Sequence, residues 1–376
     1  MGARWGCVLV AASLAAAAPR QEGALARPAA TLPKAEVGTH AGWRGRTMPP
    51  LYDLALGAFQ RGDAPAAIEF ATVLLERDPD SPPALLLLGG AYFRLRRYDD
   101  AVYVYERFLR HAPEELLKTR HLAHALHSLG RDAEARAHYL AVLARPAERG
   151  GLAGAARANA LRGLGLTLRE LGELTEARAA LLEARALAPL DNEVHLALGR
   201  VDEERGDLAA ARASAQRARE LAPFDPRAAF LLATLALDLG EGEVASAQFR
   251  AFERLAPLDV QLRDLELRLL HRPSDRAALL GIGRLQLAQG DAVGAQRTLA
   301  RLGADSLEGL CLRLDRDAAG APESARGAAE ALLARHALAP EAWDALEAYR
   351  RLIGDVAGAA EARARAAALR SRPEGR

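Results

Sequence analysis

The sequence predicts an all-α fold, built from antiparallel helix pairs that repeat along the chain. Ala, Leu, Arg and Glu dominate its 376 residues, and all four favour helices. Aromatic residues make up only 5% of the chain, and runs of Val, Ile, Thr and Tyr that would indicate strands are missing. Glycine, alanine and proline also recur in fixed columns, with 34 residues between Pro79 and Pro113 and between Pro189 and Pro223. Together these observations predict a helical repeat array.

The first residues are typical of an export signal. Residues 1–18 (MGARWGCVLVAASLAAAA) place one Arg before an apolar stretch that is too short for a bilayer span of about 20 residues. Small residues permit cleavage after Ala17, or as late as Ala26. Cys7 stands at the start of the apolar stretch rather than its end, so lipidation is not expected. We therefore expect an exported protein, periplasmic or extracellular; the alternative is a cytoplasmic protein with an Ala-rich start.

Residues 19–48 follow the leader without any periodicity. They contain Pro, Gly, Arg and Thr, a composition that indicates a flexible linker. Beyond the leader Cys311 is the only cysteine, so the mature chain has no partner for an intrachain disulfide.

The repeat begins after this linker and is defined first by glycine and alanine. Seven glycines are each followed by an alanine five residues later: Gly62/Ala67, Gly130/Ala135, Gly172/Ala177, Gly206/Ala211, Gly240/Ala245, Gly290/Ala295 and Gly354/Ala359. Arg96 takes the glycine position before Ala101. A glycine adopts the left-handed conformation that closes a helix, and an alanine allows two helices to approach closely. Each unit is therefore predicted to be two helices joined by a tight turn.

Prolines then mark the end of the second helix, because proline cannot continue a helix. They stand twelve residues after the alanine, at Pro79, Pro113, Pro189, Pro223 and Pro257. Two irregularities interrupt the period: about eight inserted residues around 148–154, and an extra segment that looks like one unpaired helix ending at Arg272-Pro273. We predict about six repeats over 49–258, an extra helix or connector over 259–273, and a second block over 274–373 with degenerate repeats and a C-terminal cap helix.

These columns make the chain resemble the tetratricopeptide-repeat (TPR) family over about residues 49–373. The best-matching unit has the family's signature positions at Leu85, Leu88, Gly89, Tyr92, Tyr98, Ala101, Tyr105, Phe108 and Pro113. The resemblance implies a right-handed superhelical solenoid whose first helices line a concave, peptide-binding groove. It implies groove positions five and nine residues into each repeat. The residues expected to line the groove are those at these positions together with His127, which lies near them: Tyr52, Arg120, His124, His127, Arg162, Arg200, Phe230 and Arg284.

The arginines of this set suggest what the groove binds. The Lys and Asn with which chaperone-binding members of the family hold a carboxylate are missing here. Guanidinium groups can instead grip carboxylates bidentately, so we expect an extended peptide with acidic and apolar residues. The alternative is that Arg120, Arg162 and Arg200 are solvated or paired with acidic residues of the chain, namely Glu170, Glu193, Glu203 and Glu204.

Three histidines offer a different chemistry. His121, His124 and His127 recur every third residue on one expected helix, so two of them could share a metal ion. Over six residues, however, their directions diverge by about 120°, and no cysteine lies nearby. A metal-binding or cofactor-associated protein is therefore an alternative to the peptide-binding one.

The rest of the sequence points away from catalysis. It has no zinc-protease HExxH, no phosphate-binding Walker loop and no serine elbow. Its 50 basic and 49 acidic residues nearly cancel, which argues against nucleic acid as a partner. We expect no cofactor, no integral membrane span and no enzyme. The expected function is a protein-protein interaction scaffold in envelope assembly or a secreted complex, with structural self-association as a further alternative.

Overall fold

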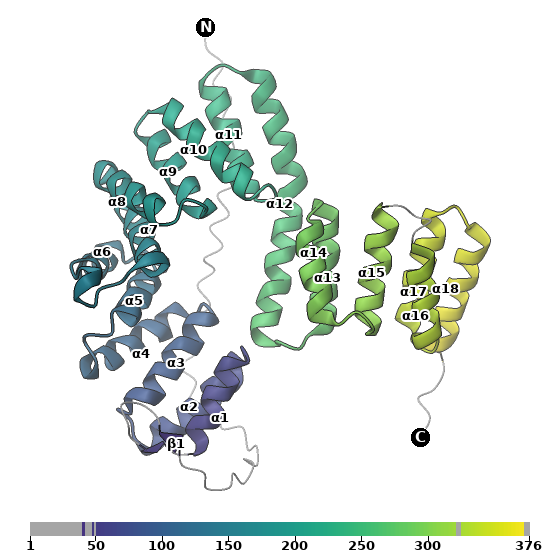
Figure 1. Cartoon of the computed structure of the whole chain (residues 1–376), viewed down its shortest axis with the longest axis horizontal. Helices are drawn as coiled ribbons and strands as arrows, with labels where there is room; N and C mark the ends of the chain where they lie inside the picture. Colours follow the sequence, from purple (N-terminus) through teal and green to yellow (C-terminus); the bar gives the residue numbers. More distant parts are fainter. Residues whose placement is uncertain (1–39, 42–46, 49, 321–324, 372–376) are drawn as a thin grey trace. The chain divides into compact units, whose positions relative to one another are not determined.

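The computed structural model describes residues 40–41, 47–48, 50–320 and 325–371 of the chain. The expected signal peptide, with both cleavage positions, lies outside the described residues, as does most of the expected linker. Within that linker, strand β1 (His40–Ala41) pairs antiparallel with β2 (Thr47–Met48). All other regular structure in the described ranges is helical (Figure 1).

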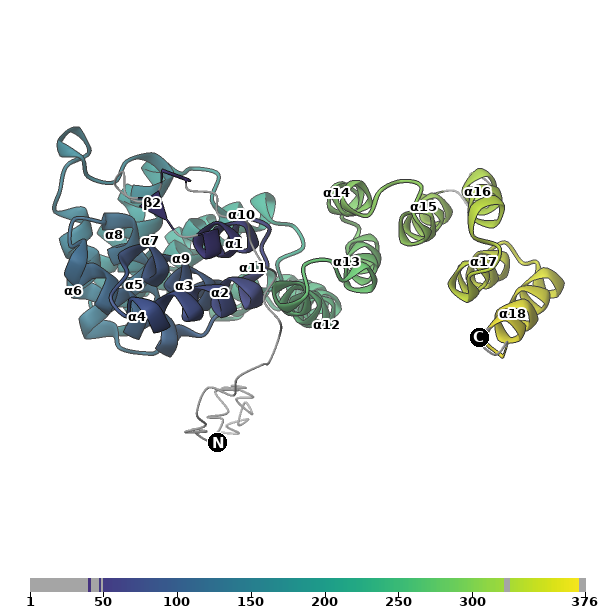
Figure 2. The same cartoon turned by 90° about the horizontal axis from the view of Figure 1, so that it is seen from below.

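The helices of the first part of the array form sequential antiparallel pairs (Figures 1 and 2). The first helices of the pairs are α1 (Pro50–Gln60), α3 (Pro82–Arg94), α5 (Leu116–Ser128), α7 (Gly154–Glu170), α9 (Asn192–Glu204) and α11 (Pro226–Asp238). Their second helices are α2 (Ala64–Arg77), α4 (Tyr98–His111), α6 (Asp132–Leu143), α8 (Leu174–Leu187), α10 (Leu208–Leu221) and α12 (Gly242–His271). The predicted all-α fold of paired helices is therefore confirmed.

Six further helices complete the described part of the chain. They are α13 (Arg276–Gln289), α14 (Ala292–Leu302), α15 (Leu307–Gly320), α16 (Arg326–His336), α17 (Pro340–Leu352) and α18 (Val356–Arg370). A separate apolar cluster joins α15 to α18 through residues such as Leu310, Leu332, Leu346 and Ala362. None of the helices in the described ranges is long and apolar enough to cross a membrane.

The turn inside each pair uses the predicted glycine. Gly172 has φ 78°, and its N–H donates to the Arg169 carbonyl while the next N–H, of Glu173, donates to the Leu168 carbonyl, both at 2.9 Å. These bonds satisfy carbonyls that the end of α7 would leave without partners. Arg96 is the exception in this column: it adopts φ 58° with a side chain present, a conformation that costs about 1–2 kcal/mol in non-glycine residues.

The alanine column allows each pair to pack closely. The eight alanines of this column are at most 3% exposed: Ala67, Ala101, Ala135, Ala177, Ala211, Ala245, Ala295 and Ala359. In the fourth unit a methyl group on Gly165 would lie 2.5 Å from Leu181 Cγ and 3.2 Å from the Ala177 carbonyl oxygen. The predicted role of small residues between paired helices is thus confirmed.

The proline column holds at four of its five positions. Helices α2, α4, α8 and α10 end at Arg77, His111, Leu187 and Leu221, each two residues before its proline. The inserted segment between the third and fourth pairs contains the short 3₁₀ helix η2 (Ala147–Arg149), after which α7 begins.

At Pro257 the expectation is wrong. Instead of ending the second helix, Pro257 lies inside α12, which is 30 residues long and includes residues 259–271 of the segment expected as an extra helix or connector (Figure 1). After Pro189 the side chain of Asp191 accepts a hydrogen bond from the Glu193 N–H and starts a new helix. The matching carboxylate after Pro257 belongs to Asp259, and it pairs with Arg263 one turn further along the same helix.

Tertiary packing also holds the second half of α12 in helical form. Leu269 packs against the cluster of Leu279, Leu299 and Leu312, and Leu270 packs against the cluster that includes Ala58 and Leu95 of the first units. A proline inside a helix costs about 3 kcal/mol. A separate helix after Pro257 would have no second helix to pair with. On a continuous helix Leu269 and Leu270 pack against other helices, and this packing offsets the cost of the proline.

Candidate functional site

Every residue predicted to line a groove lies on the first helix of a pair. Tyr52 is on α1, Arg162 on α7, Arg200 on α9 and Phe230 on α11; Arg120, His124 and His127 are on α5 and Arg284 is on α13. Helices α5, α7, α9 and α11 also each contact the next of these four in sequence (Figures 1 and 2). We call the surface formed by α5, α7, α9 and α11 the first-helix face.

Arg120 is a partly enclosed cation of this face. It is half-buried, and burial lowers the pKa of its guanidinium, an effect that the nearby Arg162 reinforces and Tyr139 opposes. Its Nη2 lies 2.8 Å from the ring Nε2 of His121, and its Nε is buried without a hydrogen-bond partner in the described structure. Among the described residues no carboxylate pairs with Arg120, so its charge is poorly compensated by the protein itself.

Two tyrosines that the sequence analysis did not assign to the site surround Arg120. Tyr105 on α4 and Tyr139 on α6 are fully or almost fully buried, and burial raises the pKa of both hydroxyls. The Tyr105 hydroxyl has no hydrogen-bond partner among the described residues. A methyl group on Gly163 of α7 would lie 2.3 Å from the Tyr139 hydroxyl oxygen, so the glycine leaves room for this ring. Both tyrosines lie on second helices, whereas the residues predicted to line the groove lie on first helices.

Arg162 on α7 and Arg200 on α9 are two further cations of this face. Arg162 is half-buried, and its guanidinium lies 3.7 Å from Asp191 and 3.3 Å from the amide oxygen of Asn159. Arg200 is also half-buried, and it has no hydrogen bond or ion pair in the described part of the chain. Burial lowers the pKa of Arg200, and the charges of Arg169 and Arg227 lower it further, while Glu203 and Asp225 oppose this shift.

The four glutamates proposed as internal partners are engaged elsewhere. Arg169 pairs with both Glu170 and Glu204, and Arg227 pairs with Glu193. Glu203 accepts a hydrogen bond of 3.1 Å from the Thr234 hydroxyl. In the described structure none of the three groove arginines forms an ion pair with these four glutamates, although the charge of Glu203 acts on Arg200. The ion pair that does form joins Arg162 to a different carboxylate, that of Asp191.

The three histidines of α5 face different partners. His121 stacks on Phe93 with ring centroids 4.8 Å apart, so it packs between two repeats. His124 bonds through Nδ1 to the Ser128 hydroxyl at 3.1 Å, and His127 bonds through Nδ1 to Asp132 at 2.6 Å. Within the described ranges, no group of three or more His, Cys, Asp or Glu side chains has the geometry to hold a metal ion.

The remaining predicted residues differ in character. Phe230 is 43% exposed, and its ring lies 5.2 Å from Phe252 and 6.1 Å from Phe249 of α12. Tyr52 is half-buried against the first apolar cluster. Arg284 pairs with Asp315 of α15 at 2.7 Å, so a partner within the chain already occupies it. The first-helix face therefore presents cations on α5, α7 and α9, followed by an exposed aromatic ring on α11.

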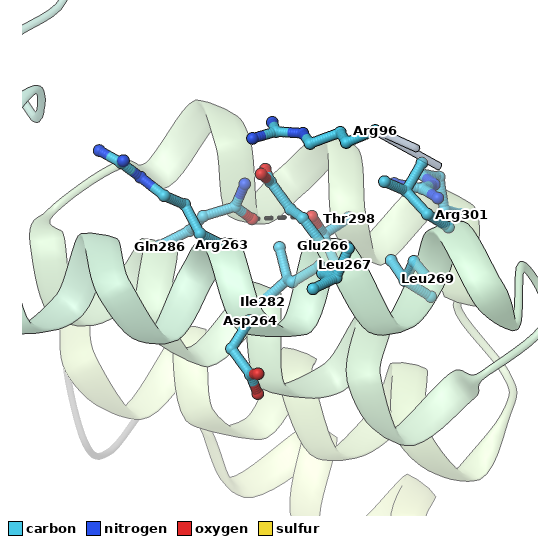
Figure 3. A pocket seen from close by; sticks show the side chains of 11 residues that line it. Arg96, Arg263, Asp264, Glu266, Leu267, Leu269, Ile282, Gln286, Thr298 and Arg301 are labelled. Atoms are coloured by element: carbon cyan, nitrogen blue, oxygen red, sulfur yellow. Dashed lines mark hydrogen bonds between the residues drawn. The ribbon is translucent and has the colours of Figure 1, made fainter. Parts of the chain in front are cut away.

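A separate pocket, which the sequence analysis missed, lies beside α12 (Figure 3). Its volume is about 590 Å³, and its lining is Arg96, Arg263, Asp264, Glu266, Leu267, Leu269, Leu270, Ile282, Gln286, Thr298 and Arg301. The Thr298 hydroxyl donates to the Gln286 side chain at 2.7 Å, while Asp264 points to the opposite side from Arg96 in this view. Because arginines, carboxylates and leucines are mixed in this lining, the pocket favours neither anions nor cations.

Comparisons with known proteins identify the repeat. The family model for the tetratricopeptide repeat matches residues 52–115 and 196–260. No curated protein matches the sequence significantly.

Several solved structures are similar to this chain. PilW, described as a widely conserved type IV pilus biogenesis factor, is 20% identical, with a TM-score of 0.48 over 55% of this chain and 92% of that one. A dimer of human IFIT1 with PPP-AAAA is 18% identical, with a TM-score of 0.42 over 88% and 75%. MamA from Desulfovibrio magneticus is 22% identical, with a TM-score of 0.41 over 46% and 92%.

Proposed function

We propose that the chain is a non-enzymatic scaffold that binds an acidic, partly apolar peptide segment of a partner protein on the first-helix face. Two stretches of the chain match the tetratricopeptide repeat, which supports a binding role. The observation that carries this proposal is the state of Arg120 and Arg200. Both are half-buried on first helices, and neither forms a direct ion pair with a carboxylate in the described structure, although Glu203 and Asp225 lie close enough to act on Arg200. A half-buried cation without a partner has lost part of its hydration, so a carboxylate supplied from outside stabilises it.

The aromatic residues on and beside α11 indicate that the ligand also carries an apolar side chain. The exposed ring of Phe230 lies against the half-buried rings of Phe249 and Phe252. Aromatic residues are enriched where partner proteins bind, since they bury large apolar area with few rotatable bonds. A ligand with carboxylates and a neighbouring apolar side chain therefore satisfies both parts of the face.

Site-specific photo-crosslinking tests this function. We expect benzoylphenylalanine in place of Phe230 to crosslink a partner in cells, and mass spectrometry to find acidic residues around the crosslinked position. The same group in place of Tyr103, which is 62% exposed on the second helix α4, is the matched control. The double variant Arg120→Glu/Arg162→Glu should lower capture about tenfold or more, because attraction becomes repulsion.

The matching charge control is Arg110→Glu/Arg185→Glu, which changes two exposed arginines of the second helices α4 and α8. It should leave capture unchanged. Equal loss in both double variants, or equal capture from positions 230 and 103, would contradict binding on the first-helix face.

We also propose that the chain is exported and acts in envelope assembly or in a secreted complex. The support is the sequence of residues 1–18, a single Arg followed by a short apolar stretch. Residues 1–48 fused to alkaline phosphatase, which is active only after export, should give active enzyme in bacteria. Replacing Leu9 and Val10 in the apolar stretch with Arg should abolish that activity, and a fusion that stays active despite this change would exclude an export signal.

A further inference from the structure

The cations of the first-helix face follow one another along the array, with Arg200 one helical turn nearer the end of its helix than Arg120 and Arg162 are. Arg120, Arg162 and Arg200 lie on α5, α7 and α9, which are consecutive first helices in contact, and Phe230 lies on α11, the next one. Arg120 and Arg162 are close enough that each charge disfavours the other, which is one reason for the lowered pKa of Arg120. A ligand that neutralises the arginines in sequence would remove this repulsion.

The distance between neighbouring first helices sets how far apart the matching residues of a ligand must be. Packed helices are about 8–10 Å apart, and an extended peptide rises about 3.3 Å per residue. One step from a first helix to the next therefore corresponds to about three residues of an extended peptide. A helical ligand rises about 1.5 Å per residue, so carboxylates three residues apart on a helix would be too close together to reach successive arginines.

The occupant is not the chain's own N-terminal segment. Residues 19–48 contain five basic side chains (Arg20, Arg27, Lys34, Arg44 and Arg46) but only two acidic ones, Glu22 and Glu36. A net positive segment would be repelled by the three arginines. Charge complementarity therefore points to a segment of another protein.

Building on the proposed function, we infer that the first-helix face recognises an extended segment whose carboxylates are about three residues apart, followed about three residues later by an aromatic or large aliphatic residue. The carboxylates pair in turn with Arg120, Arg162 and Arg200, and the apolar residue packs on Phe230. Arg162 exchanges its 3.7 Å contact with Asp191 for a bidentate contact with the ligand. The face thus selects a pattern of charges as well as a net charge.

Synthetic peptides of one composition test this spacing with the full chain. The spaced peptide carries Glu at its first, fourth and seventh positions and Phe at the tenth, separated by Ser and Gly. The clustered peptide carries the same residues with the three Glu adjacent, and a third peptide has Gln in place of each Glu. We expect fluorescence anisotropy to show about tenfold tighter binding of the spaced peptide than of the clustered one, a difference of about 1.4 kcal/mol. The Gln peptide should not bind.

Variants identify where the difference arises. Arg162→Gln should bring the affinity for the spaced peptide down to that for the clustered one, whereas Arg185→Gln on α8 should change neither. Equal affinities of the wild-type chain for the spaced and clustered peptides would overturn the inferred spacing and leave the proposed function standing. Failure of every acidic peptide to bind would overturn both.

Discussion

Replacing Pro257 with alanine is expected to raise the free energy of unfolding of the region around α12 by about 2–3 kcal/mol. Proline removes one backbone hydrogen bond inside a helix and its ring collides with the preceding turn, at a cost of about 3 kcal/mol relative to alanine. The greater freedom of alanine in the unfolded chain returns part of this gain. Because Pro257 lies inside a continuous helix, the substitution restores the missing bond. Urea denaturation and hydrogen exchange of the α12 amides measure the effect.

Pro189 provides the matched control for this prediction. It stands in the same Pro-Leu-Asp sequence as Pro257, but α8 ends before it and α9 begins after it. Pro189→Ala should therefore give no gain and a loss of up to about 1 kcal/mol, because only the unfolded chain gains freedom. If Pro257→Ala behaves like Pro189→Ala, α12 is interrupted at Pro257 and the repeat is regular there.

The contrast between these two prolines also shows how far the sequence predicts this fold. Turns and helix ends that depend on local chemistry were predicted correctly, as at Gly172 and at the helix end before Pro189. Helix α12 was not, because Pro189 and Pro257 stand in the same Leu-Ala-Pro-Leu-Asp sequence. The leucines that pack α12 against distant helices are not visible in that sequence. Tertiary packing overrides a local helix-breaking signal where enough apolar area is buried.

The candidate site shows a similar division. Placement of Arg120 and Arg162 on first helices follows from the repeat period, which a single sequence contains. The surroundings of Arg120 do not: Tyr139 comes from the second helix of the same pair, and Tyr105 comes from the preceding pair and approaches Arg120 because adjacent pairs pack together. Nor could the sequence show that Arg162 pairs with Asp191 rather than with a nearby glutamate. Side-chain pairing depends on rotamers and on distances between helices, which the period leaves open.

The second large effect is a loss of stability in mild acid that depends on His121. The ring stacks on Phe93, lies beside Tyr105, and touches the Arg120 guanidinium. Burial, followed by the charges of Arg120 and Lys118, lowers the pKa of His121 from 6.5 to about 3. A protonated His121 would place a second cation against Arg120 in a partly buried site, so the folded chain keeps this ring neutral.

The sign of the pH dependence follows from the difference in proton binding. The folded pKa lies below the unfolded value, so between these two values the unfolded chain binds more protons. The stability that comes from a neutral His121 is present above pH 6.5 and is lost as the pH falls toward 3, by up to about 1.4 kcal/mol per pH unit. Lowering the pH from 7.5 to 5.0 should therefore cost up to about 2 kcal/mol through this residue.

His121→Gln should remove that part of the loss, since glutamine does not titrate. Urea denaturation at pH 7.5 and pH 5.0 gives the two free energies for each variant. His124 and His138 also have lowered pKa values because of their enclosed surroundings, so the variant keeps a smaller acid sensitivity of the same sign. His111→Gln, at an exposed position at the end of α4, should retain the full difference. If His121→Gln loses as much stability between pH 7.5 and pH 5.0 as the wild-type chain, then Arg120 and His121 are separated in the folded chain. In that case Arg120 is already hydrated before any ligand binds.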